Sequence, residues 1–131
     1  MTSEALVQEA VDAFNRADRA AVERLLAPDF ELHSPLSDMR GSPYEGHDGA
    51  YQWFDDLSEN FAGLETIVDE VVSVRGDRVL GLGRARVAGR TSGLDYEQPV
   101  ALVIDVADSR IRRIWVMFDH EEARRRASEL G

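Results

Sequence analysis

The chain has 131 residues, a net charge of -10 and no cysteine. Its length suits one domain with its own hydrophobic core over residues 1–131, and the missing thiols exclude disulfides, cysteine nucleophiles and zinc–thiolate sites. The negative charge disfavours nucleic acid as a partner, and the sequence has no run of about 18 apolar residues that would predict a membrane span.

The basic residues and the start of the chain narrow the function classes further. All fifteen basic residues are arginine, which excludes lysine as a Schiff-base former or general base. The first residues lack the basic and apolar stretches of a secretory signal. Together with the absence of cysteine, this predicts a cytoplasmic protein with neither a nucleic-acid nor a membrane partner.

The first half of the chain is predicted to be mainly helical. Apolar residues recur at helical spacing over residues 3–16 and predict an amphipathic helix. Asp18 can cap a second, shorter helix that Pro28 ends. Residues 30–34 alternate as a strand does, and residues 35–46 have the composition of an irregular rim or lid loop.

The second half of the chain is predicted to form a sheet followed by a helix. A third helix, over residues 50–61, precedes the sheet because its apolar residues follow the helical pattern. Short segments rich in turn-forming residues then separate four strands, which predicts antiparallel hairpins. The strands are expected over residues 64–75, 78–90, 94–106 and 110–119, with turns at 75–77, 91–93 and 107–109 and a closing helix over 121–130.

This order of elements predicts the fold class. Helices gathered before strands are typical of an α+β domain with helices on one face of an antiparallel sheet. Gly81 and Gly83 lie inside the second long strand, where glycine weakens pairing unless a sharp bend needs the space. The sheet is therefore expected to be strongly curved.

The last predicted strand is an apolar run whose side chains alternate between two faces. One face carries Ile114, Val116 and Phe118, and the other carries Trp115, Met117 and Asp119. Because both faces are mainly apolar, both are expected to be covered.

Six short motifs occur in order along nearly the whole chain. They are residues 14–18 (FNRAD), 26–30 (LAPDF), 44–49 (YEGHDG), 92–93 (SG), 98–99 (QP) and 110–119. In this order and spacing they resemble the nuclear transport factor 2-like superfamily, and within it the SnoaL-like polyketide cyclase and ketosteroid isomerase-like proteins. The resemblance implies a cone-shaped barrel in which a strongly curved antiparallel sheet wraps around three N-terminal helices. The resemblance also implies a short C-terminal helix and a deep apolar cavity.

The resemblance also assigns the two faces of the last strand. It places Ile114, Val116 and Phe118 inside the cone, with Trp115 and Met117 on the outer face of the sheet. Trp115 and Met117 would then form an exposed apolar patch, which predicts a partner. Members of the family commonly form dimers through the outer face of the sheet, so the resemblance implies a homodimer through this face. The alternative is that an edge loop or the final helix of the same chain covers the patch.

The positions that match the family's catalytic residues carry other side chains here. The general base of ketosteroid isomerases falls on Ser34, their tyrosine on Ala10 and their acid on Val100. The pocket acid of limonene-type epoxide hydrolases falls on Val116. The resemblance therefore implies a pocket more strongly than it implies any one of these reactions.

Three residues near the expected pocket could still transfer a proton. His33 is a possible general base near neutral pH, and Asp119 could pair with His120 as an acid–base dyad. Alternatively, His33 is a hydrogen-bonded structural residue, and Asp119 caps the last helix with Glu122 at the third helical position.

The other residues of the expected pocket would hold a small apolar ligand. They are Ser34, Tyr44, Tyr51, Trp53, Phe54, Gln98, Val100, Ile114, Val116 and Phe118. The three histidines are far apart in the sequence and lack the spacing of metal ligands, so neither a metal nor another cofactor is predicted.

Two functions follow from these observations. The first is an isomerase or cyclase that acts by proton transfer on an apolar, carbonyl-bearing substrate. The second is a non-catalytic domain for ligand binding or dimerisation, which keeps the cavity without the family's acid–base residues. A titratable side chain that opens into an enclosed cavity would favour the enzyme.

Overall fold

The computed structural model describes residues 2–89 and 95–131. Within them the chain forms five helices and six strands. In chain order these are α1 (Ser3–Asn15), α2 (Arg19–Leu25), β1 (Leu26–His33), α3 (Pro35–Arg40), β2 (Tyr44–Glu45), α4 (Gly46–Asn60), β3 (Phe61–Arg75), β4 (Arg78–Gly89), β5 (Asp95–Ala107), β6 (Arg110–Met117) and α5 (His120–Arg126). None of these helices is both long and apolar enough to cross a membrane.

The strands form one curved sheet in the order β2-β1-β6-β5-β4-β3. From β3 to β6, neighbours pair antiparallel as their short connections predict, although the turn predicted at 91–93 lies outside the described residues. β1 and β6 are parallel, which corrects the expectation of a purely antiparallel sheet. Most of the chain separates these two strands, so no hairpin constrains their relative direction. The edge strands β2 and β3 do not pair with each other, so the cone is an unclosed sheet.

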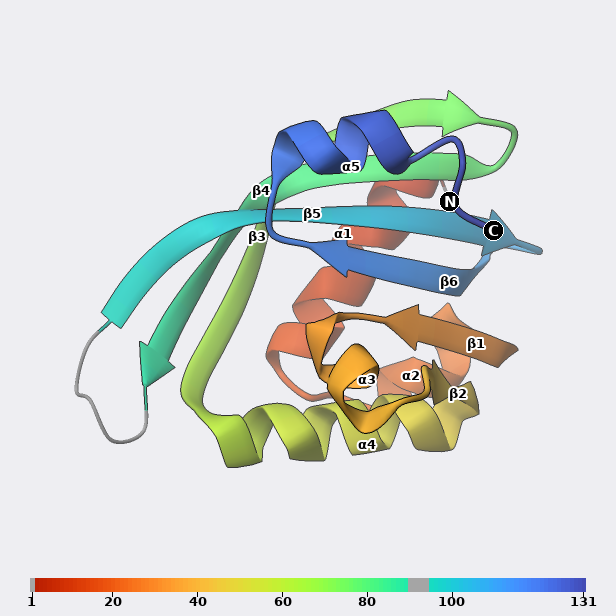
Figure 1. The fold of residues 1–131 in the computed structure, drawn as a ribbon. Coiled ribbons are helices and arrows are strands. Elements are labelled where there is room, and N and C mark those ends of the chain that lie inside the picture. The colour runs from red at the N-terminus through yellow and green to blue at the C-terminus, as the bar shows by residue number, and fades with distance from the viewer. Residues whose placement is uncertain (1, 90–94) are drawn as a thin grey trace.

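Helices cover both faces of this sheet (Figure 1). α1 lies against the concave face, and α4 contacts β1 and β2 at one edge and β3 at the other. The larger hydrophobic core lies between the concave face and these helices, and a second, smaller core lies beneath α5 on the convex face. The predicted α+β class and the curved sheet around N-terminal helices are thus confirmed.

The bend of the sheet centres on Gly83 in β4. A Cβ atom at this position would lie 1.8 Å from the carbonyl oxygen of Ile67 on β3. The pairing register of β3 also shifts between Val68 and Glu70, directly opposite. A bulge of this kind bends a strand, and only glycine allows the two backbones to approach so closely.

The segment predicted as an irregular loop, residues 35–46, contains α3 and β2 instead. Ser34 caps α3, because its Oγ accepts a hydrogen bond from the backbone N–H of Ser37, and the Oγ of Ser37 accepts one from the N–H of Ser34. Pro35 is the first helical residue, where its missing N–H costs nothing. Proline and serine favour turns and helix starts alike, which is why composition alone predicted a loop.

The other element boundaries differ from prediction by a few residues. Asp18 caps α2 as expected, but α2 ends at Leu25 and β1 begins at Leu26, so that Pro28 lies within the strand. The final helix is α5, which is shorter than predicted. Asp119 is its N-cap and accepts a hydrogen bond from the N–H of Glu122 at 3.0 Å, which confirms the capping alternative.

Candidate functional site

The concave side of the sheet encloses a cavity of about 200 Å³. α1, α3 and α4 form one side of it, and the inner faces of β1 and of β3 to β6 form the other. Its lining residues are mostly aliphatic or aromatic: Val7, Ala10, Val11, Phe14, Asn15, Leu32, Ser34, Pro35, Leu36, Trp53, Leu57, Phe61, Leu64, Thr66, Ala85, Val87, Tyr96, Gln98, Val100, Leu102, Ile104, Ile111, Ile114, Val116 and Phe118.

Strand alternation determines which sheet residues reach this cavity. Ile114, Val116 and Phe118, which the resemblance placed inside the cone, all line it, while Met117 lies in the core on the convex face. On β5, Val100 and Leu102 follow the same rule. From Tyr96 to Ile104 and again from Ile114 to Phe118, every second residue therefore contributes to one wall of the cavity.

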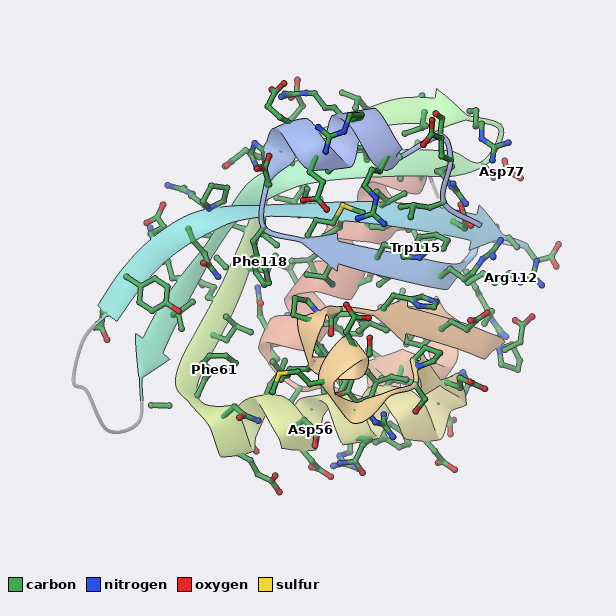
Figure 2. All side chains as sticks on the ribbon, in the orientation of Figure 1. Asp56, Phe61, Asp77, Arg112, Trp115 and Phe118 are labelled. Atoms are coloured by element: carbon green, nitrogen blue, oxygen red, sulfur yellow. The ribbon has the colours of Figure 1, made fainter. Side chains whose placement is uncertain are left out.

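The mouth of the cavity carries exposed aromatic side chains. Tyr96 and Phe118 line the cavity although 52% and 42% of their surfaces remain exposed. Figure 2 shows Phe118 beyond the end of β6 and Phe61 at the junction of α4 and β3, on the side where the sheet bends over. A ligand entering here would meet aromatic surface first.

Few polar side chains line the cavity. Those that do are Asn15, Ser34, Thr66, Tyr96 and Gln98, and no residue among the described lining carries a charge at neutral pH. Asn15 is already engaged, because its Nδ2 donates to the backbone oxygen of Thr66 and its Oδ1 accepts from the N–H of Thr66, both at 2.9 Å.

The four positions matched to catalytic residues of the family all lie in the cavity wall. Ala10, Ser34, Val100 and Val116 are each among its lining residues. The structure therefore places these positions together around the cavity, but the side chains there supply no carboxyl, imidazole or phenol group.

The three predicted proton-transfer residues lie outside the cavity lining. His120 is held at the start of α5, where its Nε2 lies 2.9 Å and 3.0 Å from the carbonyl oxygens of Gly83 and Val100. Asp119 caps the same helix. These contacts are structural, so they do not support the assignment of Asp119 and His120 as an acid–base dyad acting in the cavity.

His33 points to the convex side of the sheet. Its ring stacks on Trp115 with centroids 5.5 Å apart, and its Nε2 lies 3.4 Å from a carboxylate oxygen of Glu31. Because alternation places Leu32 and Ser34 inward, His33 must point outward. The structural alternative for this histidine fits these contacts better than a role in the cavity.

Three aromatic residues predicted for the pocket pack beside it instead. The buried Tyr44 donates its phenol to Asp56 at 2.5 Å; burial, together with this hydrogen bond and the negative charge of Asp56, raises the pKa of Tyr44 to about 12. Tyr51 lies under the guanidinium of Arg19, and Phe54 packs edge to face against Phe14. These residues thus support the helices that form the cavity wall, whereas Trp53 lines the cavity as predicted.

The outer face of β6 is partly covered by the chain itself. Met117 is buried with Ala123 and Ala127 of α5, so the alternative of a covering final helix applies to this residue. Trp115, which Figure 2 shows on β6, is partly buried between His33 and the guanidinium groups of neighbouring arginines. A homodimer through this face stays a prediction, restricted to the surface that α5 leaves open.

An ion cluster holds the C-terminal residues over the same face. Arg78, only 5% exposed, binds both carboxylate oxygens of Asp105 at 2.6 Å and 2.9 Å. Its Nη1 also donates to the backbone oxygens of Ala127 and Leu130. Burial by itself would raise the pKa of Asp105, but the hydrogen bonds and charge of Arg78, with the charge of Arg113, lower it below its usual range.

The described residues offer no evident metal centre. In residues 2–89 and 95–131, no three histidine, cysteine, aspartate or glutamate side chains are grouped so that they could hold a metal ion.

Tyr96 is a cavity residue that the sequence analysis missed. Its alternation with Gln98 on β5 was the signal that could have found it, since both point to the same face.

Comparisons with known proteins agree with this geometry. The family model of the SnoaL-like domain matches residues 7–114. Among solved structures, an NTF2-like protein of unknown function from Burkholderia pseudomallei is 26% identical, with a TM-score of 0.78 over 95% of this chain and 97% of that chain. No curated protein sequence is significantly similar to this chain.

Two more distant solved structures share the fold. IdmH from Streptomyces antibioticus, described as a candidate polyketide cyclase, is 22% identical, with a TM-score of 0.74 over 92% of this chain and 94% of that chain. TerC, crystallised with polyporic acid, is 18% identical, with a TM-score of 0.78 over 97% of this chain and 98% of that chain. At these identities the likeness shows the NTF2-like fold alone.

Proposed function

Because this chain belongs to the SnoaL-like domain family, we propose that it binds one small, largely apolar molecule in the cavity on the concave side of its sheet. The observation that carries the proposal is an uncharged cavity of about 200 Å³ between α1, α4 and the sheet. Small-molecule sites are typically concave and mostly apolar, with a few polar groups that orient the ligand. Gln98 and Tyr96, whose side chains make no hydrogen bond within the described part of the chain, give this cavity such groups.

The structure supports ligand binding better than it supports catalysis in which His33, Asp119 or His120 transfers a proton. A general acid or base must come within hydrogen-bond reach of the atom it protonates or deprotonates. His33, Asp119 and His120 contact other parts of the protein, outside the cavity lining. A non-catalytic ligand-binding domain therefore needs no rearrangement of these side chains.

A cyclase or isomerase is the second candidate. The fold shared with IdmH supports it, as do Tyr96 and Gln98, which could polarise the carbonyl of an apolar substrate confined in the cavity. A ketone such as 2-tetralone offers a direct assay. Faster exchange of its α-protons in D₂O with the protein than in buffer, followed by NMR, would favour the enzyme over the binding domain.

Filling the cavity should abolish ligand binding. We expect N-phenyl-1-naphthylamine, whose fluorescence rises in apolar surroundings, to bind the wild-type protein. In Val116→Phe the added ring would occupy part of the cavity. We expect the dissociation constant to rise about tenfold or more, because a tenfold rise requires the loss of only about 1.4 kcal/mol of binding free energy. The measurement is a fluorescence titration of both proteins.

Val72→Phe is the matched control for this titration. Val72 lies on β3, is 36% exposed and does not line the cavity, so the same replacement there should leave the affinity unchanged. Equal fluorescence enhancement with all three proteins would contradict binding in the cavity. Mass spectrometry of the denatured protein would identify any molecule that co-purifies with it.

We also propose that two copies of the chain associate through the part of the convex face that α5 leaves open. The partly exposed ring of Trp115 supports this proposal, because apolar surface of this kind gains from being covered. Light scattering of the purified protein should then give twice the chain mass of 14.6 kDa. A single-chain mass at micromolar concentration would rule the dimer out.

A further inference from the structure

The second half of β3 is an open edge of the sheet. β3 is the last strand in the sheet order, and no strand of the described chain pairs with its outer side. Near its middle, α1 covers this side: Gln8 donates to the backbone oxygen of Val68 at 3.0 Å. Asn15 likewise bonds the N–H and C=O of Thr66. Over residues 70–75, which run along the upper border of the sheet in Figure 1, no other described element bonds the outward backbone groups.

The composition of this segment suits pairing with another strand. It reads Glu-Val-Val-Ser-Val-Arg, so its interior carries neither a charge nor a proline. β-Branched residues favour strands, and proteins usually protect an open edge with charged side chains or proline. Val72 is also 36% exposed, which is unusual for a large apolar residue of this chain. An edge of this kind is a template for an additional strand.

The register of β3 determines which side chains of the segment share a face. Cross-strand neighbours share a face, and the β4 partners of Glu70, Val72 and Arg75 are buried on the convex side. The register shifts between Ser73 and Arg75, so that Arg75 lies on the same face as Glu70, although strict alternation would put it on the opposite one.

A second copy of this segment complements the first. In an antiparallel pair with a twofold axis at Val72, the two Val72 side chains face each other, and Val71 of each copy faces Ser73 of the other. Because of the register shift, Glu70 of each copy then faces Arg75 of the other. Opposite charges directly across a strand pair stabilise it, and like charges destabilise it.

Both charged side chains are available for these contacts. Glu70 and Arg75 are exposed, and neither forms an ion pair within the described part of the chain. Arg75 hydrogen-bonds through its Nε alone, which donates to the backbone oxygen of Ser128 at 3.0 Å, and its charge helps to lower the pKa of Asp105.

We propose that two copies of the chain associate edge to edge through residues 70–75 of β3, which pair antiparallel. This surface is separate from the convex face around Trp115, because β4 and β5 lie between β3 and β6. It does not involve the cavity or its ligand. Since the paired segment is short, association is expected toward millimolar protein concentrations and not in micromolar titrations.

Sedimentation velocity over a concentration series tests this proposal. The wild-type mass should double across the series. Glu70→Arg and Arg75→Glu each place like charges opposite one another at both ends of the pair, so each should raise the dissociation constant by about tenfold or more. An equimolar mixture of these two variants should regain wild-type association, because every arginine then faces a glutamate.

Glu65→Arg is the matched control, since it makes the same charge change beside the part of β3 that Asn15 covers. It should associate as the wild type does. Should Arg75→Glu fail to fold, Val72→Lys places like charges at the twofold axis and should also prevent association. If a dimer through the convex face forms as well, the mass doubles from that dimer, and the variants at residues 70 and 75 stop only this second step.

A wild-type mass that does not rise with concentration would overturn the proposal and leave a strand of a different protein as the occupant of this edge. Association that is unchanged in both Glu70→Arg and Val72→Lys would also overturn it, because the contact would then use another surface. Loss of ligand binding in the cavity would change neither result.

Discussion

Replacing Asp105 with asparagine should lower the free energy of unfolding by about 3–5 kcal/mol, the usual cost of removing one partner from a buried ion pair. Asp105 is the carboxylate partner of the buried Arg78 and lies 3.2 Å from the Nε of Arg113. Without it, the positive charge of Arg78 would stay buried beneath α5, and its partners within the described part of the chain would be the backbone oxygens of Ala127 and Leu130 and the ring of Trp115. Urea denaturation at pH 7 measures the change.

The pH dependence of this effect follows from the lowered pKa of Asp105. A carboxyl group whose pKa is lower in the folded state stabilises the protein above its unfolded pKa and loses that effect as pH falls through the folded value. The stability difference between wild type and Asp105→Asn should therefore be largest near neutral pH. It should shrink once the pH falls below 3.8, the unperturbed pKa of the group.

Asp69→Asn is the control for Asp105→Asn. Asp69 pairs with Arg84 at 3.8 Å, but the side chains are 58% and 42% exposed. Exposed ion pairs of this kind contribute at most about 1 kcal/mol. Equal losses from the two substitutions would show that the buried cluster does not stabilise the C-terminal segment more than a surface pair does.

Replacing Val116 with aspartate should be the second strongly destabilising change, by about 3 kcal/mol at pH 8. Val116 lines the uncharged cavity, where a carboxylate would find no cation among the described lining residues. Burial of this kind raises the pKa of a carboxyl group, and a rise of about two units corresponds to about 2.7 kcal/mol. The loss of valine's apolar contacts adds to this penalty.

The sign of the pH dependence is opposite to that of Asp105. Because the introduced carboxyl group would have a raised pKa in the folded state, its penalty is complete above that value and disappears as pH falls toward the unfolded pKa of about 3.9. Val116→Asp should therefore be closer to wild-type stability at pH 5 than at pH 8. Urea denaturation at the two pH values measures this difference.

Val72→Asp places the same carboxyl group on an exposed part of β3. It should cost little at either pH, since water solvates the charge. A pH-independent penalty for Val116→Asp equal to that of Val72→Asp would mean that Val116 does not face a dry cavity.

Local patterns predicted much of this fold. The antiparallel pairing from β3 to β6 and the curvature at Gly83 are confirmed, because each depends on residues that are close in sequence or directly opposite in a strand pair. The family resemblance implied the inward direction of Val116, which lines the cavity. The helix α3 was missed because Ser34 and Pro35 can begin either a loop or a helix. The parallel pairing of β1 with β6 was missed because these strands are far apart in the sequence, so no local pattern specifies their relative direction.

The candidate site likewise contains some residues whose place was predicted from the sequence and others whose contacts involve distant segments of the chain. The family resemblance implied that Gln98, Val100 and Val116 would belong to the pocket, and all three line the cavity. The contacts that hold His33 and His120 depended on packing between distant segments. His33 stacks on Trp115 of β6, and His120 bridges carbonyl groups of β4 and β5. Neither contact has a signature in the local sequence.

The sequence alone therefore determined that this chain is an α+β domain of the SnoaL-like kind and which side chains of β6 share a face. Periodicity and short turns are properties of neighbouring residues, so they can be read without coordinates. Only the tertiary structure decided what covers each face: the concave face encloses an uncharged cavity, and α5 folds back over Met117 on the convex face. These outcomes depend on where α5 and α1 dock, which is a balance of packing between segments far apart in the chain.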